Sequence, residues 1–77
     1  MIKLKNDCIF VLYQFDRGLD TEITLYCSTF KKAYKAMKDL AKMEQLKIGE
    51  PRHRQNTWTY ETNDEDIVFV IKEEKVD

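Results

Sequence analysis

Two segments of the sequence carry apolar side chains at both odd and even positions. Residues 8–15 read Cys-Ile-Phe-Val-Leu-Tyr-Gln-Phe, and residues 67–71 read Ile-Val-Phe-Val-Ile. Because successive side chains of a strand point to opposite faces, such segments need neighbours on both faces and fit the middle of a sheet. A chain of 77 residues can enclose only one thin core. We therefore expect a single domain over residues 1–77, built around two central strands.

Residues 22–27 alternate apolar and polar side chains, which is typical of a strand with one buried face. The polar segment 16–20 separates them from the first central strand, and Gly18 can take the positive φ of a tight turn. A hairpin turn at Arg17 and Gly18 places Cys8 and Cys27 roughly opposite each other. Two cysteines are too few for a disulfide scaffold or a zinc finger, and we interpret them as reduced core thiols, with a disulfide as the alternative.

One amphipathic helix is predicted after this hairpin. Ser28 or Thr29 can cap its N-terminus, and no glycine or proline follows until Gly49 and Pro51, which leaves room for nearly five turns. At 100° per residue, its apolar side chains fall within an arc of about 120°. They are Phe30, Ala33, Tyr34, Met37, Leu40 and Ala41. We expect this stripe to lie on the sheet.

The remaining strands follow the helix. Residues 53–62 place Trp58 and Tyr60 on one face and threonines on the other, and a polar turn at 63–66 leads into the second central strand. An optional short strand covers residues 2–5. The prediction is an α+β fold, a single antiparallel sheet of four to five strands with one amphipathic helix on one face, in the order ββαββ. The other face is then left to water or to a partner.

The near balance of 13 basic and 14 acidic residues hides two segments of opposite charge. Residues 29–54 contain eight basic residues against three acidic ones, and residues 61–77 contain seven acidic residues against two basic ones. On the helix, lysines at i, i+4, i+7 and i+11 form a basic ridge, and two arginines follow it: Lys31, Lys35, Lys38, Lys42, Arg52 and Arg54. The acidic turn consists of Glu61, Asp64, Glu65 and Asp66. Either group can meet a partner of opposite charge.

The sequence gives no pattern for catalysis, a metal or a cofactor. The only histidine is His53, which lies between two arginines and is expected at the surface, and both cysteines lie in apolar strands rather than in an electropositive niche. The acidic turn lacks the glycine and the distal glutamate of a calcium loop, and two glycines make no phosphate-binding motif. We therefore expect a protein that is not an enzyme and binds no cofactor.

The N-terminal residues 1–7 are too polar for a signal peptide, and the longest apolar run, residues 8–13, is too short to cross a bilayer. We expect a cytoplasmic protein with no membrane partner. If the gene belongs to a phage, this compartment is the host cytoplasm.

Two stretches of the chain carry a resemblance to known domains. Residues 26–36, Tyr-Cys-Ser-Thr-Phe-Lys-Lys-Ala-Tyr-Lys-Ala, join a strand to a capped helix, and residues 70–77 end the chain as Val-Ile-Lys-Glu-Glu-Lys-Val-Asp. In these features the chain resembles small uncharacterised ββαββ domains of bacteriophages and their hosts. The resemblance implies the fold and a phage or mobile-element setting, and it transfers no functional residue. Inhibitors of the anti-CRISPR or anti-defence type are an analogy of class.

Our leading hypothesis is a non-enzymatic protein-interaction module. In its most specific form, it is a phage or mobile-element inhibitor that binds a host protein or protein complex through the basic ridge or the acidic turn. The motivation is the small size, the one-sided helix cover and the segregated charge. The last of our three hypotheses is a homodimeric structural module paired through an edge strand or the uncovered sheet face.

The second hypothesis is a small nucleic-acid-binding module that uses the basic ridge with Arg52 and Arg54. Trp58 and Tyr60 could stack bases if they lay on an uncovered sheet face near Arg54, although two aromatic residues on one strand more often belong to a core. The ridge itself contains no arginine, which argues against sequence-specific DNA recognition.

Overall fold

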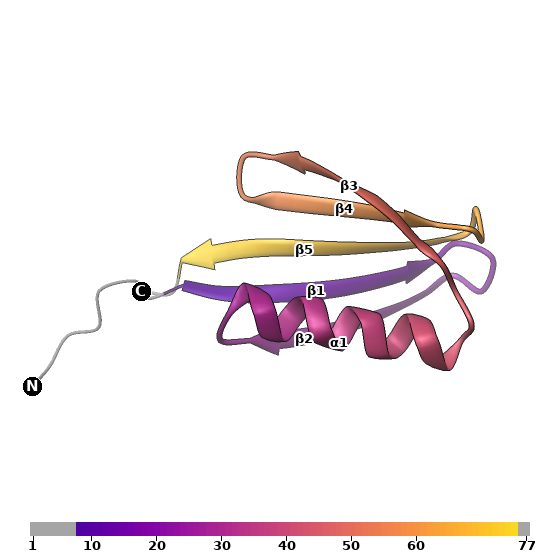
Figure 1. Cartoon of the computed structure of the whole chain (residues 1–77), viewed down its shortest axis with the longest axis horizontal. Coiled ribbons are helices and arrows are strands. Elements are labelled where there is room, and N and C mark those ends of the chain that lie inside the picture. The colour runs from indigo at the N-terminus through magenta and orange to yellow at the C-terminus, as the bar shows by residue number, and fades with distance from the viewer. Residues whose placement is uncertain (1–7, 76–77) are drawn as a thin grey trace, which may run out of the picture.

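The structure is a computed structural model that describes residues 8–75, and it shows an α+β fold of one helix and a five-stranded antiparallel sheet (Figure 1). In chain order the elements are β1 (Cys8–Asp16), β2 (Thr21–Cys27), α1 (Phe30–Met43), β3 (Ile48–Arg54), β4 (Thr57–Thr62) and β5 (Ile67–Lys75). The strand order in the sheet is β2-β1-β5-β4-β3. The two segments that are apolar on both faces are therefore β1 and β5, which lie side by side within the sheet, as predicted.

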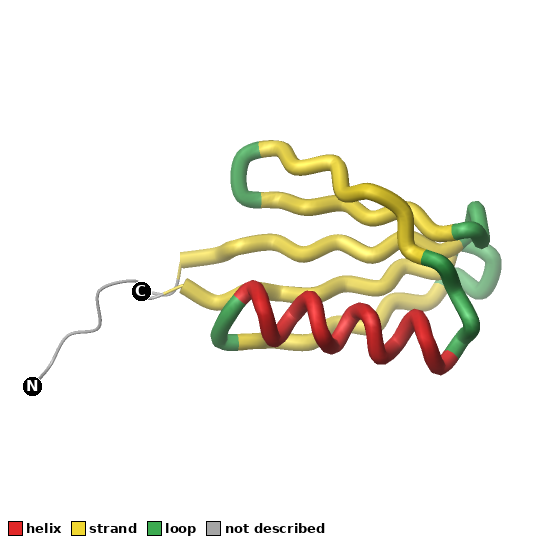
Figure 2. The backbone as a smooth tube through the Cα atoms, viewed as in Figure 1, coloured by secondary structure: helices red, strands yellow, loops and turns green. Residues whose placement is uncertain are grey.

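The element order is ββαβββ, so the predicted order ββαββ is wrong by one strand. Residues 53–62, expected as one strand, contain the end of β3, a turn at Gln55 and Asn56, and all of β4 (Figure 2). Gln55 has a φ of 56°, which a non-glycine residue adopts mainly in tight turns. The optional strand at residues 2–5 lies outside the described residues.

The hairpin of β1 and β2 forms, but its register differs from the expected one. Phe10 lies across from Cys27, and Cys8 lies across from Lys75 of β5, so the two cysteines are not opposite each other. The reason is a four-residue loop after Asp16, in which Asp20 rather than Gly18 takes the positive φ, at 55°. The Asp16 carboxylate accepts a hydrogen bond from the backbone N–H of Leu19 and holds this wider turn.

Helix α1 begins where the sequence predicts and ends earlier. The Thr29 hydroxyl accepts the backbone N–H of Lys32 at 3.1 Å, which is an N-cap bond. At the other end, the N–H of Leu46 donates to the carbonyl of Ala41, and the N–H of Gln45 donates to that of Lys42. This pair of bonds is a Schellman motif with Gln45 in the left-handed region, at a φ of 57°. Glycine usually takes that position, so this helix end has no recognisable sequence signal.

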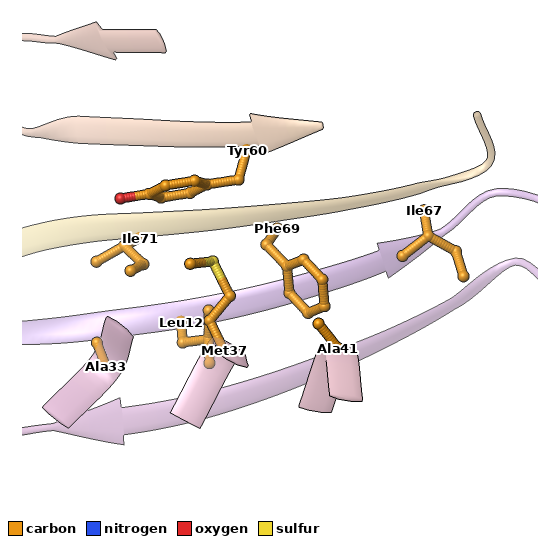
Figure 3. Packing of buried hydrophobic residues seen from close by; sticks show 8 residues of the cluster. All are labelled: Leu12, Ala33, Met37, Ala41, Tyr60, Ile67, Phe69 and Ile71. Atoms are coloured by element: carbon orange, nitrogen blue, oxygen red, sulfur yellow. The ribbon is translucent and has the colours of Figure 1, made fainter. Parts of the chain in front are cut away.

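The core lies between α1 and one face of the sheet (Figure 3). Phe69 and Ile71 of β5 and Met37 of α1 are fully buried there. The other members are Leu12, Ala33, Ala41, Tyr60 and Ile67. Fully burying each large apolar side chain contributes about 1.5–3 kcal/mol, so the alternation that aims them at α1 stabilises this one arrangement.

The sheet face opposite α1 also carries apolar side chains. Val11 is fully buried there, Tyr13, Phe15 and Val70 are half-buried, and the Tyr13 and Phe15 rings stack with centroids 5.7 Å apart. The Tyr13 hydroxyl donates to the Glu74 carboxylate at 3.4 Å. Desolvation, followed by the charge of Glu74, raises the pKa of Tyr13 above 10.0. Neighbouring side chains thus shield part of this face within the domain.

Candidate functional site: a lysine-lined groove

A single helix is too narrow to cover this sheet. An α-helix with its side chains is about 10–12 Å across, whereas five strands about 4.8 Å apart span about 19 Å. Helix α1 packs over β1, β2 and β5 and reaches β4 only through aromatic contacts with Trp58 and Tyr60, and it leaves β3 beside it uncovered (Figure 1). The result is a groove of about 1350 Å³ between α1 and β3, with Tyr60 of β4 among its lining residues. We refer to it as the basic groove.

The lysines of the predicted ridge line this groove together. They are Lys31, Lys35, Lys38 and Lys42, and Lys47 from the link between α1 and β3 joins them. Lys35 forms an ion pair with Asp39 at 3.2 Å, and the Lys38 ammonium lies 5.7 Å from the centre of the Tyr34 ring. Among residues 8–75, no carboxylate lies within ion-pair distance of Lys31, Lys42 or Lys47. Positive charge along the groove is therefore only partly neutralised.

The groove also has apolar surface. Tyr34 and Tyr60 lie with ring centroids 6.1 Å apart, and Leu46, Ile48 and Pro51 complete the apolar lining. Tyr60 is 4% exposed, whereas Tyr34 is 38% exposed and can contact a bound molecule. Burial, with a smaller contribution from Tyr34, raises the pKa of Tyr60 above 10.0, so its hydroxyl stays neutral at physiological pH. The groove thus combines cationic walls with an apolar floor.

Arg52 and Arg54 do not belong to this surface, which corrects their grouping with the basic ridge. In β3 they lie across from Thr59 and Thr57 of β4. Strand alternation directs these four side chains to the sheet face opposite α1, while Pro51 lies on the groove side. Arg52 also forms an ion pair with Glu61 on that far face. The two arginines and the ridge lysines therefore cannot contact one flat partner together.

Trp58 and Tyr60 belong to the face that α1 covers, so they do not form a base-stacking platform with Arg54. Trp58 packs against Phe30 with ring centroids 4.8 Å apart. His53 of β3 lies across from Trp58, and the two rings stack with centroids 4.3 Å apart. The His53 Nε2 lies 2.7 Å from the Gln55 carbonyl oxygen. This confirms the prediction of a core role for the two aromatic residues and of a surface position for His53.

The acidic turn is divided between two places. Asp64, Glu65 and Asp66 are exposed at the end of the sheet, beside the β1–β2 loop, whereas Glu61 lies on the far face with Arg52. Side-chain–backbone hydrogen bonds hold the turn: Asp64 Oδ1 accepts the N–H of Asp66, and the Arg17 guanidinium donates to the Glu65 carbonyl. Within residues 8–75, no three or more histidine, cysteine or acidic side chains gather as a group that could hold a metal ion.

Sequence reasoning missed the second wall of the groove. That wall is β3, whose glycine, proline and charged residues carry no strand pattern. The one available indication was the width of the expected sheet, because a single helix cannot cover five strands. It also missed a polar contact at the end of α1, where the buried Gln14 donates through Nε2 to the Glu44 carboxylate at 2.6 Å.

Comparisons of the chain with protein-family models, with curated proteins and with solved structures returned no match. Over the described part of the chain, no helix combines the length and the apolar character that crossing a membrane requires.

Proposed function

We propose that this protein is a non-enzymatic interaction module that binds an acidic segment of another protein in the basic groove. The observation that carries this proposal is the joint placement of five lysines and an apolar floor in one groove. The acidic side chains in its lining are Asp39, which Lys35 already engages, and Glu50. Binding through this groove can use Lys31, Lys42 and Lys47, for which residues 8–75 provide no ion-pair partner.

The apolar floor favours a protein segment that carries both charge and a hydrophobic side chain. Exposed ion pairs contribute only about 0.2–1 kcal/mol each, so the lysines alone give weak attraction. An aliphatic or aromatic side chain placed against Tyr34, Leu46 and Pro51 adds apolar burial, at about 25 cal/mol for each Å² removed from water. Carboxylates on either side of it would then reach the lysines. The expected ligand is a short acidic segment with one large apolar residue.

Nucleic acid is the weaker candidate for this groove. Arginine is the residue that holds phosphate through two parallel hydrogen bonds, and both arginines near the groove in sequence lie on the far face of the sheet. Trp58, the largest aromatic side chain, is packed against Phe30 instead of being free to stack on a base. The non-enzymatic part of the proposal is supported by His53. Its ring stacks on Trp58 and is bonded to the Gln55 carbonyl, which suits a structural role.

The phage or mobile-element setting expected from the sequence gives the proposal a more specific form. In that form the acidic segment belongs to a host protein, and the module is an inhibitor of the anti-defence type that acts in the host cytoplasm. The exposed carboxylates of Asp64, Glu65 and Asp66 are then a second charged surface, at one end of the groove's β3–β4 hairpin.

The test uses a displayed library of 12-residue acidic peptides, followed by fluorescence anisotropy on the enriched sequences. We expect enrichment of peptides in which aspartates or glutamates flank a phenylalanine, leucine or tryptophan. A variant with Lys31, Lys35, Lys38 and Lys42 changed to glutamine should bind these peptides at least about tenfold more weakly, which corresponds to about 1.4 kcal/mol.

The control variant removes three basic charges from the far face, through Arg52→Gln, Arg54→Gln and Lys72→Gln, and should bind the peptides as the wild type does. Circular dichroism checks that both variants fold. An equal loss of peptide affinity in the two variants would show nonspecific charge attraction and refute binding in the basic groove. Tighter binding of a single-stranded or duplex 20-mer than of any peptide, with a steep decrease between about 50 and 200 mM salt, would favour nucleic acid.

A further inference from the structure

The two edges of the sheet differ in how well they resist pairing with another strand. The β3 edge contains Pro51, which lacks a backbone N–H, an irregularity in its pairing between Ile48 and Pro51, and two arginines. Proline, bulges and charged side chains are the features that block edge-to-edge pairing. The β2 edge, Thr-Glu-Ile-Thr-Leu-Tyr-Cys, has neither proline nor lysine, and its pairing with β1 is regular over seven residues.

The β2 edge also exposes apolar side chains. Tyr26 is 73% exposed, Ile23 is 43% exposed and Leu25 is 37% exposed. At 100° per residue, the flank of α1 opposite the groove lysines carries Leu40 and Met43, with Lys32 one turn into the helix on the same flank, and Met43 is 79% exposed. A backbone edge and an apolar strip therefore lie along the same side of the domain, away from the basic groove.

The sequence of β2 can pair with a second copy of itself about Thr24. Ile23 and Leu25 flank it, and Glu22 and Tyr26 come next on either side. If two copies of β2 pair antiparallel with Thr24 across from Thr24, each Ile23 meets a Leu25 and each Glu22 meets a Tyr26. The single charge of the strand then lies beside a phenol that can donate a hydrogen bond to it, and no like charges meet.

We propose that two copies of this chain pair through β2 in that register and form a continuous ten-stranded sheet. The two helices then lie on the same face, and the four strands β1, β2 and their copies place them about 14 Å apart. Packed helices are 8–10 Å apart, so the gap leaves room for Ile23, Leu25, Leu40 and Met43 of both copies. The inference is independent of the basic groove, which lies on the other side of α1.

Sedimentation equilibrium over about 5–200 µM protein tests the proposal, and it should show a monomer–dimer equilibrium. Leu25→Lys places a charge in the apolar strip and should weaken the dimer at least about tenfold. Gln55→Lys adds the same charge at the exposed turn of the opposite edge and should leave the equilibrium unchanged. A wild-type protein that stays monomeric at 200 µM would overturn the proposal, as would equal weakening by both variants.

Cross-linking tests the register itself, in a background with Cys8→Ser and Cys27→Ala. In the proposed register the two Thr24 Cα atoms are about 4.5–5.5 Å apart, which a disulfide can span, whereas the two Glu22 positions are about 14 Å apart. Thr24→Cys should therefore oxidise to a covalent dimer and Glu22→Cys should not. A covalent dimer from Glu22→Cys without one from Thr24→Cys would refute the register.

Discussion

Replacing the buried glutamine of β1 by methionine, Gln14→Met, is expected to stabilise the protein. Gln14 is 5% exposed and lies on the face that α1 covers, across from Phe69 of β5 and Ile23 of β2. Its Nε2 donates to the Glu44 carboxylate, but its Oε1 is buried and has no hydrogen-bond partner. Methionine has the same unbranched length and carries no group that needs a partner.

The size of the effect follows from three contributions. A buried amide oxygen without a partner costs about 1–3 kcal/mol, and the hydrogen bond to a charged carboxylate contributes about 1.5–3 kcal/mol. These two roughly cancel when both are removed, because the exposed Glu44 returns to water. The apolar burial of the methionine side chain then leaves a net gain of about 1 kcal/mol, which raises Tm by about 4–8 °C in a domain of this size.

Urea denaturation and thermal melts, both followed by circular dichroism at one protein concentration, measure this gain. Glu44→Ala is the informative companion, because it leaves Nε2 of Gln14 without its acceptor and should lower the free energy of unfolding by about 1–3 kcal/mol. The two changes, made at opposite ends of one hydrogen bond, should thus shift stability in opposite directions. If Gln14→Met destabilises the protein by 1 kcal/mol or more, the reasoning about the unpartnered oxygen fails.

Two further predictions concern single residues. Burial and Tyr34 raise the pKa of Tyr60, so the unfolded chain loses this proton first, and the free energy of unfolding should hold below about pH 10 and decrease above it. In urea titrations between about pH 9 and 11 that decrease should be smaller for Tyr60→Phe than for the exposed control Tyr26→Phe; equal slopes would exclude this role for Tyr60. Gln45→Gly relieves the left-handed conformation after α1 and should raise the free energy of unfolding by about 0.5–1 kcal/mol, a gain that Gln45→Ala should not reproduce.

The parts of the fold that could be predicted are those whose sequence signal comes from burial. β1 and β5 show apolar residues on both faces, and the stripe of α1 follows from its contact with the sheet. The parts that could not be predicted depend on backbone conformations adopted by unexpected residues. Gln45 ends α1 in a position that favours glycine, and Asp20, not Gly18, sets the register of the first hairpin. β3 could not be predicted because an edge strand pairs on one side only and buries little, and its Gly49 and Pro51 are typical of the segment that follows a helix.

The candidate site was predicted in part for a related reason. Helical spacing places Lys31, Lys35, Lys38 and Lys42 on one flank of α1 whatever the rest of the chain does, so the ridge could be predicted without the fold. Arg52 and Glu61 depend on where a strand begins, because a shift by one residue reverses the face to which each side chain points. The groove itself needed the position of β3, which only the structure supplies.

The contrast between the two sheet edges also limits how large an assembly of this protein can grow. A sheet with two open edges can add copies without end, and that is the route to fibrils. Here Pro51 and the arginines of β3 close one edge, so a copy that pairs through β2 presents only closed edges to the next molecule. Growth by strand addition stops after a single step, and a protein rich in β-structure gains protection from polymerisation through the composition of one outer strand.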